Sequence, residues 1–376
     1  MHHHHEQFWW RFSPKKDLDR IYVSVALRSF AVSLISLFVP LYLYKEMGFT
    51  LDQTLIFFIF YAVVIAISSP VAAKFASRYG MKHTVFFSVP FYLVYILLLY
   101  WLPIMNIPLI LIGALAGIAV AFYWMGLHEV FYRVSDQKHR GEEVGKRAGI
   151  SVFVTLFGPL VGGLLIKLVG FQFVFMLASL MLFLAALLLF LSHDTHEPYH
   201  FSLKNLVNNK NWKDSLFFVS RGASVMAAGV IWPLFIFVIL NDYFTLGIVG
   251  SILAGVSGIL IWLVGKISDK LGKRKILRWT LGFEALSWVL RSLVYSVGSV
   301  FAVATFASVT KGVTEAPMGA LEYDKATQGD IAGYFVSREI YICLGRILLL
   351  VIVLMTDSLS GGMIFNGFAS LAALLF

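Results

Sequence analysis

The sequence predicts an all-α polytopic membrane protein with twelve transmembrane helices arranged in two pseudo-symmetric six-helix halves. Three observations support this fold class. The 376 residues are 59% hydrophobic and 14% charged, with a mean hydropathy of +0.82, whereas a soluble chain is about 45–50% apolar and about 25% charged. Apolar runs long enough to cross a bilayer recur along the whole chain. The chain also resembles itself at an offset of about 193 residues.

A helix that crosses the roughly 30 Å hydrocarbon core needs about 20 mainly apolar residues. Twelve such runs occur, near residues 21–44, 53–73, 83–102, 106–132, 148–168, 171–192, 215–240, 244–264, 276–296, 299–322, 333–356 and 359–376. The last run is short and has no polar tail, so a truncated C-terminus is one interpretation of this ending.

The distribution of Lys and Arg predicts that both termini are cytoplasmic, because positive residues concentrate in cytoplasmic loops. With this orientation, Lys45 and Lys167 are the exceptions in outer loops. Four further cations lie within predicted spans, namely Arg28, Arg291, Lys311 and Arg346. The net charge of +9 is therefore explained by topology, and no nucleic-acid surface is expected. We expect a multi-pass protein of a plasma membrane of the bacterial inner-membrane type, surrounded by the lipid bilayer.

The repeat pairs residues at corresponding places in the two halves. Arg28, Pro40, Met125, Gly126 and Glu129 are matched 193 residues later by Arg221, Pro233, Met318, Gly319 and Glu322. This predicts a cytoplasmic N-terminus at 1–20, a first half at 21–192, a cytoplasmic linker at 193–214 and a second half at 215–376. His2 to His5 are interpreted as a tag remnant. The linker histidines, His193, His196 and His200, are interrupted by Pro198, so no metal site is predicted.

The segment GKISDKLGKRK lies between the spans 244–264 and 276–296 and resembles the loop motif of the major facilitator superfamily, G-x-x-x-D-R/K-x-G-x-R/K-R/K. The matching residues are Gly265, Asp269, Lys270, Gly272, Arg274 and Lys275. A first copy keeps Arg78 and Gly80 but has Ala73 and Ser77 in place of the glycine and the acid. The resemblance covers essentially the whole chain. It implies that Asp269 is a latch on the closed cytoplasmic side, and the alternative is that Asp269 merely relieves repulsion among the cations.

A second motif begins just before the span 148–168 and continues into it. It consists of Gly145, Gly158, Pro159, Gly162 and Gly163, and it is similar to the antiporter motif of drug and metabolite exporters, with Val154 as a departure. Physically, glycines permit close helix contact and a proline removes a backbone donor. The resemblance favours export, and packing without any bearing on direction is the alternative.

Five ionisable residues lie well inside predicted spans, namely Glu284, Arg291, Lys311, Glu315 and Arg346. Each would cost about 2.5–3.5 kcal/mol if it faced lipid, so we expect these residues to pair or to face a water-filled cavity. Helical steps place Lys311, Glu315 and Glu322 on one face. In the superfamily that the chain resembles, this helix lines the central cavity. The corresponding wall of the first half would be apolar and aromatic, with Phe122 on it and Tyr123 and Trp124 nearby.

We expect Lys311 to attract an anionic group of the solute and Glu315 to take up a proton. The alternative is an i,i+4 ion pair that only stiffens the helix. For Glu284 and Arg291 a structural role is favoured, and Arg346 is open to either role. A cytoplasmic salt-bridge gate is predicted from Arg28, Glu129, Arg221 and Glu322, and fixed pairs within each half are the alternative.

Together these features predict a secondary active transporter that moves a small organic solute by alternating access, with protons as the coupling ion and export favoured. We expect a monomer without a cofactor, and no enzymatic activity. A lipid flippase or a uniporter of the same fold is the alternative. From other classes, a membrane-embedded enzyme and a transport-dead sensor are the rival interpretations.

Overall fold

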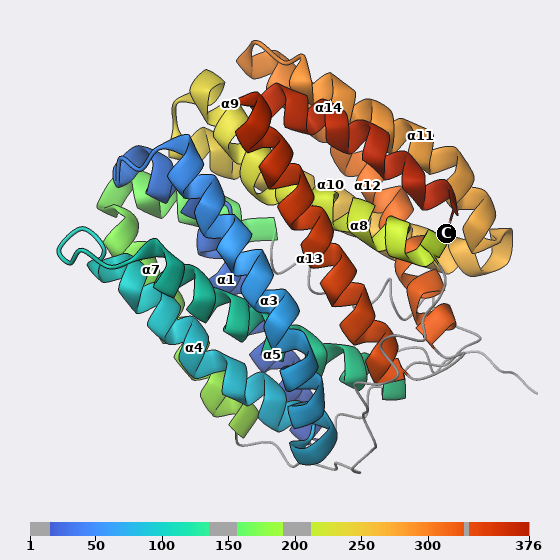
Figure 1. Ribbon diagram of the computed structural model, residues 1–376, viewed down its shortest axis with the longest axis horizontal. Helices are drawn as coiled ribbons and strands as arrows, with labels where there is room; N and C mark the ends of the chain where they lie inside the picture. Colours follow the sequence, from blue (N-terminus) through green and yellow to red (C-terminus); the bar gives the residue numbers. More distant parts are fainter. Residues whose placement is uncertain (1–15, 135–155, 191–211, 327–330, 376) are drawn as a thin grey trace, which may run out of the picture.

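The computed structural model describes residues 16–134, 156–190, 212–326 and 331–375, and within these ranges the chain forms helices and short turns without strands (Figure 1). The first half contains α1 (Lys16–Ser36), α2 (Val39–Leu41), η1 (Tyr42–Glu46), α3 (Leu51–Tyr79), α4 (Met81–Trp101), α5 (Leu109–Val134), the helix Leu156–Val169 and α7 (Phe171–Phe190). The second half contains α8 (Trp212–Met226), η4 (Ala227–Ile231), α9 (Trp232–Leu240), α10 (Tyr243–Leu271), α11 (Lys273–Ser292), α12 (Val297–Ala326), α13 (Ile331–Thr356), α14 (Leu359–Ser370) and η5 (Leu371–Leu375).

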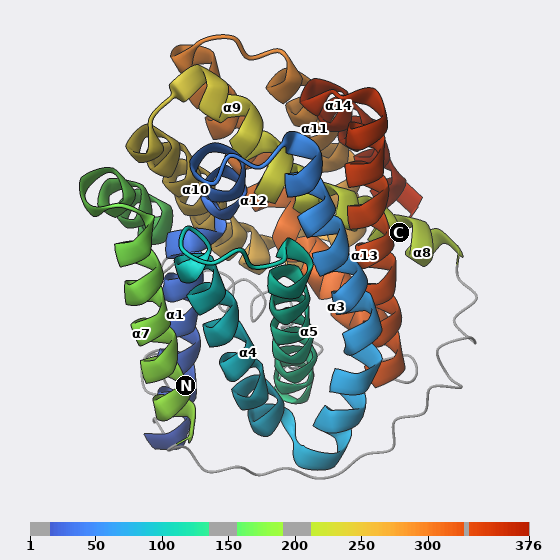
Figure 2. The same cartoon turned by 60° about the vertical axis from the view of Figure 1, so that its left-hand side comes forward.

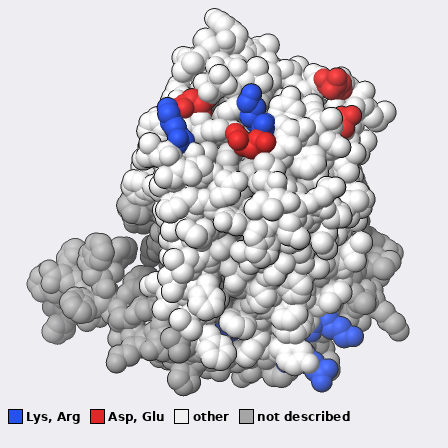
Figure 3. All heavy atoms as spheres, turned by 90° about the vertical axis from the view of Figure 1, so that its left-hand side faces the viewer, with Lys and Arg blue, Asp and Glu red and all other residues white. Residues whose placement is uncertain are grey.

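The prediction of a polytopic helical membrane protein is confirmed. In the described ranges, nine helical segments are long and apolar enough to cross a membrane. The segment α11 has 20 residues and carries several charges, and the helices Leu156–Val169 and Leu359–Leu375 are shorter. Together these segments account for the twelve predicted spans. Figure 3 shows one face on which charged side chains lie near the top and the bottom and a broad uncharged belt lies between them, as expected for a surface in contact with lipid.

The two prolines of the repeat interrupt their helices at corresponding places. A proline cannot donate a hydrogen bond to the carbonyl four residues earlier, which is Ser36 for Pro40 and Gly229 for Pro233. The first helix accordingly ends at Ser36 and resumes at α2, with π-helical turns in η1. In the second half, η4 forms a π-helical turn directly before Trp232 and Pro233. The pseudo-repeat that the sequence indicates therefore extends to local backbone irregularities.

The two halves meet along two seams. One seam lies between α3 and α13, which run side by side in both ribbon views (Figures 1 and 2). The other lies between the helix Leu156–Val169 and α10. There a Cβ atom added to Gly247 would lie 2.3 Å from the carbonyl oxygen of Pro159, and one added to Gly163 would lie 2.4 Å from that of Tyr243. Glycines of the predicted exporter motif thus permit close approach of the two halves.

The same motif also packs against α1. A Cβ atom on Gly158 would lie 1.7 Å from Ser33 Oγ, and one on Gly162 would lie 2.3 Å from the carbonyl oxygen of Leu34. Pro159 lies in the first described turn of the helix, and Gly145 lies outside the described residues. The physical role of the described glycines is close packing.

Candidate functional site

An ion pair between α8 and α12 forms the centre of a charge network in the second half. Arg221 on α8 donates a hydrogen bond from Nη2 to Glu315 Oε1 on α12. Arg221 also interacts electrostatically with Glu322 on α12 and with Glu284 on α11. The network therefore connects three helices, and Arg221 is its central cation.

Lys311 lies one helical turn before Glu315 on α12. Its side chain is exposed and interacts electrostatically with Glu315, Arg221, Arg291 and Glu284. Among the described residues it forms no direct ion pair, because the carboxylate of Glu315 is bonded to Arg221 instead. The predicted charged face of α12 is thus present, but the partner of Glu315 comes from another helix.

Glu284 belongs to this network rather than standing apart from it. It interacts electrostatically with Arg221, Glu315, Lys311 and Arg291. Arg291, one of its neighbours on α11, is buried and stacks on two tryptophans, with Cζ 3.9 Å from the ring centroid of Trp288 and 5.2 Å from that of Trp232. A cation over an aromatic face is stabilised by about 2 kcal/mol or more when water is excluded.

Glu322 is held by a residue that sequence reasoning missed. Arg338 on α13 lies with Nε 2.9 Å from Glu322 Oε2, and its Nη1 bonds Glu339. Glu322 and Glu339 are both nine-tenths or more buried. The signal was present in the sequence, because Glu339 lies almost two helical turns inside the predicted span 333–356.

Two further ion pairs strengthen the predicted cytoplasmic end of the second half. Lys325 Nζ lies 2.5 Å from Asp214 Oδ1 and joins α12 to α8. Lys273 Nζ lies 2.7 Å from Asp324 Oδ2 and joins α11 to α12. Both pairs, like those of Arg221 and Arg338, lie within the second half.

Arg28, the counterpart of Arg221 in the first half, has a different environment. Its Cζ lies 3.2 Å from the ring centroid of Tyr123 and 5.5 Å from that of Tyr92. The side chain is buried, and its Nε has no hydrogen-bond partner in the described structure. The side chain of Glu129, the other predicted gate residue of this half, lies outside the described residues.

The three aromatic residues predicted at or near the first-half wall have different surroundings. Phe122 is buried against the rings of Phe75 and Phe87, Tyr123 covers Arg28, and Trp124 is exposed. Consecutive helix positions differ by about 100° in direction, so three adjacent residues cannot line one surface.

Arg346 on α13 is 6% exposed. Its Nη1 lies 3.9 Å from Cys343 Sγ, which is a weak contact, and its Nε has no hydrogen-bond partner in the described structure. Cys343 is fully buried and reduced, in agreement with the absence of any other cysteine.

The loop motif occupies equivalent turns in the two halves. Gly80 lies between α3 and α4 with φ +91°, and Gly272 lies between α10 and α11 with φ +89°. Glycine is favoured there because side chains disfavour positive φ. Gly265 is buried, and Arg78, Arg274 and Lys275 are exposed. The side chains of Asp269 and Lys270 lie outside the described residues, so the latch stays a prediction.

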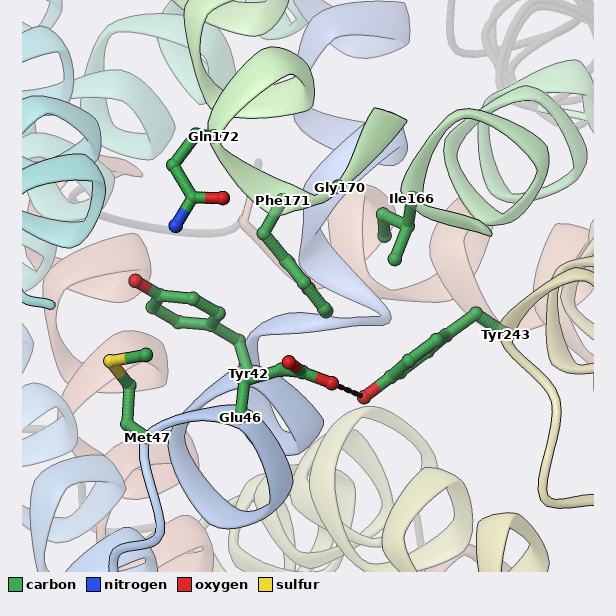
Figure 4. Close-up of a pocket in the computed structure, with 8 residues that line it drawn as sticks. All are labelled: Tyr42, Glu46, Met47, Ile166, Gly170, Phe171, Gln172 and Tyr243. Atoms are coloured by element: carbon green, nitrogen blue, oxygen red, sulfur yellow. Dashed lines mark hydrogen bonds between the residues drawn. The ribbon is translucent and has the colours of Figure 1, made fainter. Parts of the chain in front are cut away.

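A second group of polar residues joins the two halves at the predicted extracellular end. Tyr243 Oη donates a hydrogen bond to Glu46 Oε1 at 2.5 Å across a small pocket (Figure 4). The lining residues are Tyr42, Glu46, Met47, Ile166, Gly170, Phe171, Gln172 and Tyr243. We call this group, with the neighbouring pair Lys167–Asp242, the outer seam.

The Lys167–Asp242 pair explains one exception to the charge distribution of the loops. Lys167 Nζ lies 2.9 Å from Asp242 Oδ1. The hydrogen bond from Lys167 lowers the pKa of Asp242, helped by bonds from Thr245. Among the described residues, the ion pair that joins the two halves, Lys167–Asp242, thus lies at the predicted extracellular end. The described pairs at the predicted cytoplasmic end, Lys325–Asp214 and Lys273–Asp324, lie within the second half.

Comparisons with known proteins agree with this architecture. The sequence profile of the Major Facilitator Superfamily matches residues 21–348. The "Uncharacterized protein YqgE" of Bacillus subtilis (strain 168) is 23% identical over 346 residues, which cover 85% of this chain and 78% of that protein. The multidrug resistance protein MdtG of Proteus mirabilis (strain HI4320) is 26% identical over 302 residues, 74% of each chain. A crystal structure of the E. coli fucose:proton symporter FucP has a TM-score of 0.68 at 12% identity and covers 96% of this chain and 97% of its own.

Proposed function

Because the chain belongs to the major facilitator superfamily and is a multi-pass membrane transporter, we propose that it is a secondary active transporter of a small organic solute. Transport proceeds by alternating access between two six-helix halves and is coupled to protons. Glu315 carries the coupling proton, and Arg221 is the cation that responds to it.

The ion pair between Arg221 and Glu315 carries this proposal. A charge-assisted hydrogen bond to a carboxylate weakens strongly when the carboxyl group becomes neutral. Proton uptake by Glu315 would therefore release Arg221, which already interacts with Glu284 and Glu322. This exchange of partners lets α8 move relative to α12, and such discrete rearrangements are the usual basis of conformational switching.

In the proposed cycle, the predicted gate and the predicted latch close the cytoplasmic end when the extracellular end opens. The outer seam joins the halves at the predicted extracellular end. When that seam opens, the opposite end closes through the predicted gate, in which Arg28 and Glu129 act with Arg221 and Glu322, and Asp269 docks as a latch. The present pairing of Glu322 with Arg338 holds this gate residue within its own half.

Export is the proposed direction. Support comes from the similarity to a multidrug resistance protein and from the glycine motif of the helix Leu156–Val169. The fold alone does not decide direction, since the structurally similar FucP is a symporter.

Proton movement in reconstituted vesicles tests the proposal. The purified protein is sealed into vesicles with an internal pH dye and challenged with sugars, organic anions and amphipathic cations. We expect one class to trigger proton flux, and Glu315→Gln to abolish it. Asp52→Asn is the matched control, because Asp52 is an exposed acid in the first turn of α3. Silence of the unmodified protein across the panel would contradict coupling and favour uniport or lipid flipping.

A further inference from the structure

Two buried arginines on opposite sides of the α3–α13 seam have no described carboxylate partner. Arg28 is 8% exposed and Arg346 is 6% exposed, and the Nε atom of each lacks a hydrogen-bond partner in the described structure. Removing an ionised group from water costs several kcal/mol unless another group compensates. Tyr123 compensates Arg28 in part through its ring, and a weak contact to Cys343 does little for Arg346.

Tyr61 on α3 connects the two arginines. Its hydroxyl group interacts electrostatically with both Arg28 and Arg346. Its side chain is partly exposed and packs against Cys343, Ile65 and Ala121, where α3, α5 and α13 come together. Cys343 is also the contact of Arg346, and Tyr123 on α5 covers Arg28, so both arginines lie near the helices that Tyr61 packs against.

The numbers of cations and carboxylates at this site also favour an anionic ligand. Among the side chains that the structure describes, the network and the α3–α13 seam contain more cations than carboxylates. The cations are Arg28, Arg221, Arg291, Lys311, Arg338 and Arg346, and the carboxylates are Glu284, Glu315, Glu322 and Glu339. Glu339 is the carboxylate that interacts electrostatically with Tyr61. It is already bonded to Arg338. A site with uncompensated guanidinium groups in the membrane interior is suited to an anion.

We propose that Arg28, Arg346 and Tyr61 bind the anionic group, a carboxylate or a phosphate, of an organic solute when the α3–α13 seam opens. The inference rests on the proposed transport function and names the substrate class. It places the anionic group at this seam rather than beside Lys311. Lys311 already interacts with the carboxylates of Glu315 and Glu284 in the second half. The rings of Tyr92 and Tyr123 offer an apolar surface for the body of the solute.

Equilibrium binding to the purified protein in lipid nanodiscs tests this site. Four probes share one ring and differ in charge: benzoate, phenyl phosphate, benzyl alcohol and benzylamine. We expect at least one anion to bind and the neutral and cationic probes not to bind. The comparison of benzoate with phenyl phosphate distinguishes a carboxylate site from a phosphate site.

Arg28→Gln and Arg346→Gln should each weaken anion binding about 10- to 100-fold, because each removes a charged hydrogen-bond donor. Arg28→Lys and Arg346→Lys keep the charge and should bind with intermediate affinity. Tyr61→Phe removes a neutral donor, perturbs folding least and should weaken binding about 3- to 10-fold. Arg278→Gln is the control, because Arg278 is an exposed arginine on α11 and its loss should leave binding unchanged.

Failure of both anions to bind, or equal anion binding by the unmodified protein and the Arg28, Arg346 and Tyr61 variants, would overturn the site. Preferential binding of benzylamine would overturn the charge assignment. The outcome is separable from the proposed function: proton flux without anion binding refutes this site alone, and anion binding without flux refutes the coupling alone.

Discussion

Arg28 and Arg221 occupy corresponding positions in the two halves, yet their surroundings differ. Arg221 is ion-paired with Glu315, whereas Arg28 lies over the ring of Tyr123. The residue of the first half that corresponds to Glu315 is Phe122, 193 positions earlier, so the same carboxylate is missing there. The repeat therefore preserves the position of the arginine in each half. The group that contacts the arginine differs, because Phe122 stands in the first half where the second half has Glu315. In the second half the arginine pairs with a carboxylate, whereas in the first half it lies against aromatic rings.

The largest expected effect concerns the closest helix contact of the second half. A Cβ atom on Gly222 would lie 1.8 Å from the carbonyl oxygen of Ile342, and one on Gly345 would lie 1.8 Å from that of Val219. We expect Gly222→Leu to destabilise the protein by about 3 kcal/mol or more, since α8 and α13 must separate. The yield of monodisperse protein and the thermal midpoint in detergent measure this. Gly282→Ala is the control, because nothing lies within 4 Å of its added Cβ, and equal loss in both variants would refute the packing argument.

An intermediate effect distinguishes the two arginines directly. Arg221→Met leaves Glu315 without its partner, and we expect a loss of about 1–3 kcal/mol in the free energy of unfolding. Arg28→Met loses the ring contact but also removes a buried charge without a described ion-pair partner. The two effects oppose each other, so we expect a change of about 1 kcal/mol or less in the free energy of unfolding. Thermal unfolding of the two variants side by side gives the comparison. A greater loss for Arg28→Met would show that Arg28 has an acidic partner and would remove the contrast between the halves.

The smallest expected effect concerns the Lys167–Asp242 pair of the outer seam. The pKa of Asp242 is lowered in the folded protein by the bond from Lys167. Its contribution is therefore present above the unfolded pKa of about 3.9 and is lost as the pH falls through the lower folded value. Because both side chains are partly exposed, Asp242→Asn should cost about 1 kcal/mol or less at neutral pH.

The pH profile checks this assignment. The difference in thermal midpoint between the unmodified protein and Asp242→Asn should be constant from about pH 5 to pH 8 and shrink below about pH 4. Lys167→Met should give a smaller difference, because Asp242 keeps its bonds from Thr245, and the double variant should lose no more than Asp242→Asn alone. Additive effects of the two substitutions would mean that the residues act separately.

The spans could be predicted from sequence because a bilayer imposes a length that hydropathy reports directly. The helices that supply the ion-pair partners could not be predicted. Periodicity shows which residues share a face of one helix, but it does not show which neighbouring helix that face contacts. Glu284 illustrates this, because its carboxylate interacts electrostatically with Arg221 on α8 and Glu315 on α12, which the pattern of its own helix does not indicate.

Other parts of the site lacked a strong signal in the sequence. Gly222 and Gly345 are single glycines in apolar helices, and only the crossing of α8 with α13 makes them necessary. Glu46 ends η1 and Asp242 lies in the short loop between α9 and α10, and their partners are far away in the chain. Long-range contacts of this kind depend on the packing of the two halves, which no local pattern encodes.

The most direct test of the account compares two transport modes of Glu315→Gln in vesicles, with the solute class identified by the proton-flux panel. One mode is exchange of labelled for unlabelled solute without a pH gradient, and the other is accumulation driven by a pH gradient. The account predicts that the variant retains exchange and loses gradient-driven accumulation by at least about tenfold, because an amide side chain at this position accepts no coupling proton. Accumulation at the rate of the unmodified protein would contradict the assignment of the coupling proton to Glu315.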